Sequence, residues 1–335
     1  MLRTAQRAIL LPLVAAVFCG MLRPQKTPVP NQPLKLERAI PLPSVQGRID
    51  HLAADVDGKR IFIAALGNGT VEVVDLARGE RTGAIKGLKE PQGLLYLPQN
   101  NTLYVATGGD GQLRSYNANT LALIGSVKLG DDADNVRYDP KTDSIMVGFG
   151  DGAIAFLTRD LQRKDKAEVP LPAHPESFQI SSNGSQVLVN LPHDQSIAAF
   201  RIGSPGITSK WTHLGAQSNF PMAMDRQHGR FFVACRTPAQ LLELREDSPS
   251  VVQRISTVGD ADDLFWDEAH NRIFVIGGEG FVDVVDASPN GQMRSIAHIL
   301  SAPGARTGLL VGSKLLVAAP HRNTEPARLL VFTEE

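Results

Sequence analysis

Pairs of polar residues recur along this chain at nearly constant intervals, and their types could support binding or catalysis. Their first members are separated by steps of 42 or 44 residues, and most carry a carboxylate. Carboxylates that crowd into one site repel each other, so some must be paired, protonated or bound to a cation. The pairs are Asp50-His51, Gln92-Gly93, Asp134-Asn135, Glu176-Ser177, Phe220-Pro221, Asp262-Asp263 and Arg306-Thr307.

A second set of polar residues follows an apolar strand in each interval. It comprises Asn68, Asp110, Asp151, His193, Arg236, Glu279 and His321-Arg322. If the two sets converge, three chemistries are open, and the first is a channel mouth whose polar groups are simply solvated. The second is a small-ligand pocket in which Arg306, Arg236 or Arg322 grips an anionic group bidentately. The third is a divalent cation, calcium or magnesium, held by oxygen ligands from Asp134, Asn135, Glu176 and Asp262.

The elements that must position these residues are short strands in a repeat. An apolar strand begins at residues 61, 103, 145, 187, 231, 273 and 315, again at steps of 42 or 44. Each follows a turn such as Asp57-Gly58-Lys59 or Gln227-His228-Gly229, whose residue types supply the positive φ of hairpins. No stretch keeps a helical period. Four short antiparallel strands in about 42 residues are typical of a propeller blade.

The seventh interval is one strand short, and a spare strand precedes the first. The chain ends soon after Leu329–Thr333, while Lys35–Pro41 has no partner in the first interval. Pairing these two segments would close the ring and remove its exposed sheet edges. The sequence therefore predicts an all-β fold with one domain over residues 35–335, a seven-bladed β-propeller of four-stranded antiparallel blades whose last blade is closed by the N-terminal strand. Strand starts and second-to-third-strand loops would then share one face of the disc.

Residues 56–64 and 69–76 resemble the repeat of YVTN (YncE-like) seven-bladed β-propellers. They read VDGKRIFIA and GTVEVVDL, where the family reads roughly PDGKRLYVAN and TVSVIDL, with Val56 in place of the family's usual proline. The WD dipeptide of WD40 repeats is absent. The resemblance covers about residues 35–333 and implies a secreted or periplasmic propeller, but it implies little about chemistry because the fold hosts many functions.

The N-terminus has the pattern of a signal peptide over residues 1–20. Arg3 and Arg7 precede an apolar run from Ala8 to Phe18, which is too short to span a bilayer. A lipid anchor at Cys19 is disfavoured, because Phe18 stands where lipoprotein signals carry Gly or Ala. A proline-rich linker over residues 21–34 follows. No other stretch is long and apolar enough to cross a membrane. We therefore expect a periplasmic or secreted protein.

Charge and cysteine content narrow the function classes. The chain has 335 residues and a net charge of −1, and removing residues 1–20 leaves 32 basic and 35 acidic side chains. A nucleic-acid partner is therefore disfavoured. Cys235 stands alone in a strand-like run and is expected to be a buried small apolar group.

Two functions remain, and no cofactor is evident apart from a divalent cation. The first is a binding or scaffold protein that recognises a small molecule or a protein partner on the channel face. The second is a metal-dependent hydrolase or lactonase acting in the channel. The candidate site residues are Asp50, His51, Gln92, Asp134, Asn135, Glu176, Ser177, Asp262, Asp263, Arg306, Arg236, His321 and Arg322.

Overall fold

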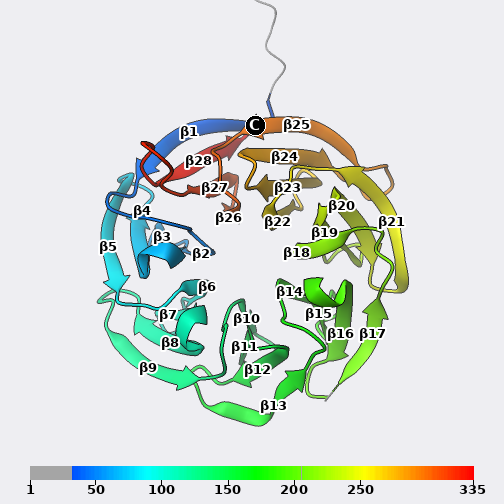
Figure 1. Cartoon of the computed structure of the whole chain (residues 1–335), viewed down its shortest axis with the longest axis horizontal. Helices are drawn as coiled ribbons and strands as arrows, with labels where there is room; N and C mark the ends of the chain where they lie inside the picture. Colours follow the sequence, from blue (N-terminus) through cyan, green and yellow to red (C-terminus); the bar gives the residue numbers. More distant parts are fainter. Residues whose placement is uncertain (1–31, 205) are drawn as a thin grey trace, which may run out of the picture. The chain divides into compact units, whose positions relative to one another are not determined.

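A computed structural model describes residues 32–204 and 206–335, which form a ring of seven four-stranded antiparallel sheets (Figure 1). The first strand of each blade lies nearest the centre of the ring. The seven blades and closure by the N-terminal strand confirm the predicted architecture. The predicted signal peptide, the Cys19 anchor and most of the predicted linker lie outside the described residues.

The strands have the following bounds. Blades 1 to 4 are β2 Leu52–Asp55, β3 Arg60–Ala65, β4 Thr70–Asp75 and β5 Glu80–Lys86; β6 Pro91–Leu97, β7 Thr102–Thr107, β8 Gln112–Asn117 and β9 Leu123–Lys128; β10 Val136–Asp139, β11 Ser144–Phe149, β12 Ala153–Leu157 and β13 Arg163–Pro170; and β14 Phe178–Ile180, β15 Gln186–Leu191, β16 Ser196–Arg201 and β17 Ile207–Trp211. Blades 5 to 7 are β18 Gln217–Asp225, β19 Arg230–Thr237, β20 Ala239–Arg245 and β21 Ser248–Ser256; β22 Ala261–Asp267, β23 Arg272–Gly277, β24 Phe281–Asp286 and β25 Arg294–Leu300; and β26 Thr307–Val311, β27 Lys314–Ala319, β28 Arg328–Glu334 and β1 Leu34–Pro41. Three single-turn 3-10 helices are η1 Leu66–Asn68, η2 Gly108–Asp110 and η3 Pro192–Asp194.

The repeating apolar strands become the second strand of each blade, and they are almost wholly buried. Every residue of β7 and of β11 is buried, because neighbouring blades cover both faces of these strands. Their side chains join seven apolar clusters, each shared by two adjacent blades. Burial of apolar surface at these seven junctions therefore stabilises the ring as a whole.

The turns between first and second strands have the positive φ that their residue types predict. Non-glycine residues occupy this conformation at four of them, and glycine, which adopts it without steric cost, at the rest. The positions are Lys59, Asn101, Asp143, Gly184, Gly229, Asn271 and Gly312.

The last blade closes as predicted, by pairing the two ends of the described chain. β1 runs antiparallel to β28, with Leu34 opposite Glu334 and Pro41 opposite Arg328 (Figure 1). The strand begins one residue earlier than the predicted segment. Leu34 and Ile40 are each 1% exposed, so β1 contributes to the core as well as to the sheet.

Two further expectations bear on function. Cys235 is fully buried, and burial raises the pKa of its thiol to about 12, so it is an inert apolar group as expected. Within the described residues, no helix has the length and apolar character that membrane spanning requires.

Candidate functional site

The fold brings several of the predicted residues around one cavity. It measures about 330 Å³ and is called the acidic cavity here. Of the predicted residues, Gln92, Asp134, Glu176, Arg236, Asp262 and Arg306 line it. Its other lining residues are Arg48, Leu66, Glu90, Asp132, His174 and Phe220.

Repeated backbone pairing explains why these positions are equivalent. The amide of Asp134 donates to the carbonyl of Gly148 at 2.9 Å, and the Gly148 amide donates to the Asn135 carbonyl at 3.0 Å. Glu176 and Ser177 form the same pair of bonds with Asn190, both at 3.0 Å. Each pair lies just before the first strand of its blade and is held by the fifth residue of the second strand, which is called the anchor strand here.

The three arginines of the acidic cavity all contact carboxylates. Arg48 Nη2 lies 2.6 Å from Asp50, and Arg236 Nη2 lies 2.6 Å from Asp262 Oδ1. Arg306 Nη1 lies 3.0 Å from an oxygen of Asp260. The Arg236 guanidinium also stacks over the Phe220 ring, 3.8 Å from its centroid. These arginines have their charges balanced within the protein, which leaves little to attract an anion.

Within the part of the chain that the structure describes, Asp262 is the one carboxylate lining the acidic cavity that has an arginine partner, and Glu90, Asp132, Asp134 and Glu176 have none. Among the described residues, no lysine or arginine nitrogen lies within 4.0 Å of Asp134 or Glu176. Burial, opposed by His51 and reinforced by Asp50, raises the pKa of Asp134 to about 8. Burial and the neighbouring charge of Asp262 raise the pKa of Glu176 to about 7. Each carboxyl group therefore titrates near neutral pH, and a bound cation would stabilise its ionised form.

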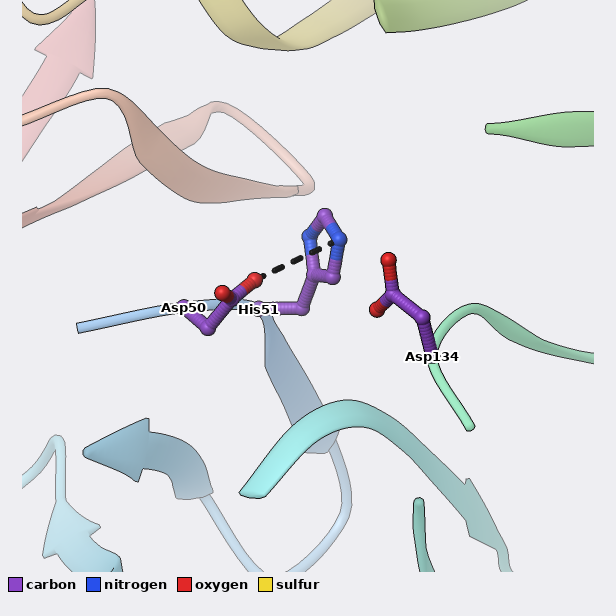
Figure 2. Close-up of side chains that lie close together, drawn as sticks. All are labelled: Asp50, His51 and Asp134. Atoms are coloured by element: carbon purple, nitrogen blue, oxygen red, sulfur yellow. Dashed lines mark ion pairs between the residues drawn. The ribbon is translucent and has the colours of Figure 1, made fainter. Parts of the chain in front are cut away.

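His51 does not line the acidic cavity and lies between the carboxylates of Asp50 and Asp134 (Figure 2). Its Nε2 is 3.5 Å from Asp50 Oδ1, and its Nδ1 is 3.4 Å from Asp263 Oδ1. Figure 2 shows Asp134 facing the imidazole from the opposite side. Burial alone would lower the pKa of His51, but Asp263 and Asp50 outweigh it and raise that pKa to about 10. The imidazole is therefore a cation at neutral pH.

One group of side chains here has the geometry of a metal site. Asp50, His51 and Asp134 each offer a ligand atom, and these atoms lie within 4.8 Å of one another. Oδ1 of Asp134 and Oδ1 of Asn135 are both buried without a hydrogen-bond partner. Of the predicted ligands Asp134, Asn135, Glu176 and Asp262, only Asp134 belongs to this group, so a cation here would use a different set.

The remaining predicted residues lie elsewhere. Ser177 and Asp263 line a second cavity farther along the channel. His321 and Arg322 line neither cavity, because the loop between β27 and β28 folds on itself through reciprocal backbone bonds between Arg322 and Glu325. His193 and Asp151 line a hollow of about 600 Å³ beside the acidic cavity.

Sequence reasoning missed five charged residues around the acidic cavity. Each lies two positions before a predicted residue, so an alternation test applied one step earlier would have found them, since side chains two apart in an extended chain share a face. The five are Arg48, Glu90, Asp132, His174 and Asp260.

The comparisons with known proteins identify the fold. No family model matches the chain, and no curated protein matches its sequence. Among solved structures, a chain of a mitotic checkpoint complex is similar over 99% of both chains, with a TM-score of 0.74 and 14% identity. A chain of the hydrazine synthase of Kuenenia stuttgartiensis is similar over 88% of this chain and 95% of that one, with a TM-score of 0.70 and 15% identity. Likeness at such low identity establishes that this chain is a seven-bladed β-propeller and leaves its function to the site.

Proposed function

We propose that this protein is an exported β-propeller binding protein that holds a small cationic ligand in the acidic cavity. The proposal rests on one observation: the arginines of that cavity are paired with carboxylates, whereas two of its buried or half-buried carboxyl groups have no lysine or arginine partner. Arg48, Arg236 and Arg306 each contact a carboxylate. Asp134 and Glu176 line the same space and, among the described residues, have no lysine or arginine within 4.0 Å.

The chemistry of the cavity favours a cation over an anion. An anion would have to compete with Asp50, Asp260 and Asp262 for the three guanidinium charges, although Arg306 Nε is a buried donor with no hydrogen-bond partner. A divalent ion or an ammonium group would instead find carboxyl oxygens that have no lysine or arginine partner. The partnerless Oδ1 of Asp134 is one such oxygen.

The hollow beside the acidic cavity gives a ligand room to enter. It measures about 600 Å³ and shares Asp132, His174 and Glu176 with the acidic cavity. His174 Nδ1 lies 2.7 Å from the carbonyl oxygen of Gly150, which fixes the ring at the boundary between the two spaces. Glu176 therefore lies at the boundary between the two spaces, where a ligand would meet it on passing into the acidic cavity.

Calorimetric titration of the purified chain with calcium, magnesium and 1,4-diaminobutane tests this proposal. We expect at least one of them to bind, and Glu176→Gln to weaken that binding roughly tenfold or more, because a charge-assisted contact contributes about 1.5–3 kcal/mol. Glu268→Gln removes the same charge from an exposed turn and is the matched control. Binding that is equal in the two variants, or the absence of binding by any of the three cations, contradicts the proposal.

A second candidate function, metal-dependent hydrolysis, is favoured by the group formed by Asp50, His51 and Asp134. A cation held there would supply Lewis-acid chemistry, and Glu176 could accept a proton from the attacking water. His51 is a cation at neutral pH and would first have to lose its proton, which favours binding over hydrolysis. Chelator-sensitive hydrolysis of a simple lactone, accompanied by zinc or calcium in the purified protein, would favour the second candidate.

Export and family membership are part of the proposal. The charged and apolar pattern of residues 1–20 supports export to the periplasm or the exterior. The repeat residues in 56–64 and 69–76 support a place among YVTN propellers. Cell fractionation tests the first point, since full-length protein retained in the cytoplasm would contradict it.

A further inference from the structure

A second cavity of about 220 Å³ lies farther along the inner strands than the acidic cavity, and no residue lines both. In blade 3, Asp134 lines the acidic cavity and Arg137 lines the second one. In blade 6, Asp262 lines the first, and Asp263 and Trp266 line the second. Because a strand rises about 3.3 Å per residue, Asp134 and Arg137 are about 10 Å apart along the channel. We call this space the arginine cavity.

Arg137 lies in the arginine cavity without an ionic partner. Its Nη1 donates to the carbonyl of Val136 at 2.9 Å, and its guanidinium lies 5.7 Å from the centroid of the Phe178 ring. Among the described residues, no carboxylate oxygen lies within 4.0 Å of it. A partly buried guanidinium remains charged at neutral pH, and leaving that charge without a counterion is costly.

The side chains around Arg137 supply further hydrogen-bond donors. Ser177, Gln179 and Arg226 line the same cavity. Trp266 lines it too, and its Nε1 is a buried donor with no partner. Gln179 and Arg226 also donate to the backbone carbonyls of Met222 and Ser181. Among the described residues, neither Arg137 nor Arg226 has a carboxylate oxygen within 4.0 Å, so the cavity holds two guanidinium charges without a counterion in contact.

Among the described residues, one carboxylate lines the arginine cavity, and it has other partners. Asp263 accepts a hydrogen bond from the Gly308 amide at 2.8 Å through Oδ2. Its other oxygen lies 3.4 Å from His51 Nδ1. Asp263 lies more than 4.0 Å from the Arg137 guanidinium, so an anion bound beside Arg137 would be its closest counterion.

We infer that the arginine cavity binds a small organic anion, with the carboxylate of that ligand paired to the Arg137 guanidinium. Arginine presents parallel donors that match a carboxylate, so the pair is bidentate and specific. Met222, Met224 and Phe265 provide an apolar wall for the body of the ligand. The volume, about 220 Å³, lies below the 300–1,000 Å³ typical of drug-sized ligands and suits a small acid. This inference does not rest on the proposed function, since the two cavities are separate.

Calorimetric titration of the full chain with sodium benzoate, sodium acetate and inorganic phosphate at constant ionic strength tests this inference. We expect benzoate to bind, acetate to bind more weakly because it lacks an apolar body, and Arg137→Gln to weaken benzoate binding at least tenfold. Arg201→Gln is the matched control, because Arg201 is exposed at the end of β16 and lines neither cavity. It should leave benzoate binding unchanged.

Two additional variants keep the result interpretable. Arg137→Lys retains the charge and loses the paired donors, so its affinity for benzoate should fall between those of wild type and Arg137→Gln. If Arg137→Gln does not fold, the comparison of Arg137→Lys with wild type still tests the inference, because Arg137→Lys should bind benzoate more weakly. Glu176→Gln lies in the acidic cavity and should leave benzoate binding unchanged, whatever it does to cation binding. No benzoate binding by wild type, equal affinity in wild type and the Arg137 variants, or tighter binding of phosphate than of benzoate would overturn the inference.

Discussion

The charge state of single residues in the channel should be visible in the pH dependence of stability. The pKa of Glu176 is raised to about 7 in the folded protein, above the usual value near 4.5. The folded state therefore keeps a proton that the unfolded chain has lost, and the stability from this group declines as pH rises from about 4.5 to about 7. Glu176→Gln carries no such proton. Its melting temperature should rise relative to wild type across this range and then stay at a constant offset above pH 7.

Melting curves of the two proteins at pH 5, 6, 7 and 8 measure this effect. A difference of 1 kcal/mol corresponds to a shift of roughly 2–4 °C for a domain of 150–250 residues, and a larger domain shifts less. Glu268→Gln, at an exposed turn, should keep a constant offset from wild type at all four pH values. An offset for Glu176→Gln that does not change between pH 5 and pH 7 would show that this carboxyl titrates normally.

The repeat spacing predicted where the polar residues of the blades lie, but it did not predict which of them form ion pairs. Repeat spacing alone placed Asp134, Glu176 and Asp262 at equivalent points of three blades, because each blade repeats the same backbone contacts. Which of them has a countercharge depends on Arg236 and Arg306, which reach across from other blades. Such contacts between blades leave no trace in the spacing of a single repeat.

At the scale of elements, a buried ion pair anchors the turn between β18 and β19. Arg230 is 1% exposed, and its Nε lies 2.7 Å from Asp225 Oδ2. Asp225→Ala should lower the free energy of unfolding by about 3–5 kcal/mol, because it leaves a buried guanidinium without its closest carboxylate. Denaturant unfolding measures this loss.

The matched control for Asp225→Ala is Asp247→Ala, in the turn between β20 and β21 of the same blade. Asp247 pairs with Arg245 at 3.2 Å, but their side chains are 74% and 46% exposed. Exposed pairs contribute little, so this variant should unfold at nearly the wild-type denaturant concentration. Equal losses in the two variants would mean that burial does not set the strength of these pairs.

The sequence predicted best those strands whose residues are all buried or alternate between buried and exposed, because these strands have a clear pattern of apolar residues. Anchor strands such as β7 and β11 have uninterrupted apolar cores, and their turns carry Asn, Asp or Gly. The outer strands were harder to place. In all seven blades the pairing between the third and fourth strands contains a register shift. A bulge of this kind adds a residue without changing composition, so a pattern of residue types does not reveal it.

At the scale of the whole molecule, closure of the ring depends on the seating of β1. Ile40 of that strand is 1% exposed, whereas Leu36 of the same strand is 50% exposed. Ile40→Ala should destabilise the protein by about 2–5 kcal/mol through the cavity it leaves, whereas Leu36→Ala should change stability little. Thermal unfolding of the two variants makes the comparison, and equal melting temperatures would contradict a docked β1.

The meeting of the two chain ends in one blade imposes an order on biosynthesis. A ribosome makes β1 first and β28 last, so the first strand has no partner until nearly the whole chain has emerged. Six blades can form in sequence while the seventh waits, with the edges of the nascent ring open to other chains. A chain that is released before Arg328 has been added would therefore lack β28, the strand that β1 pairs with to close the ring.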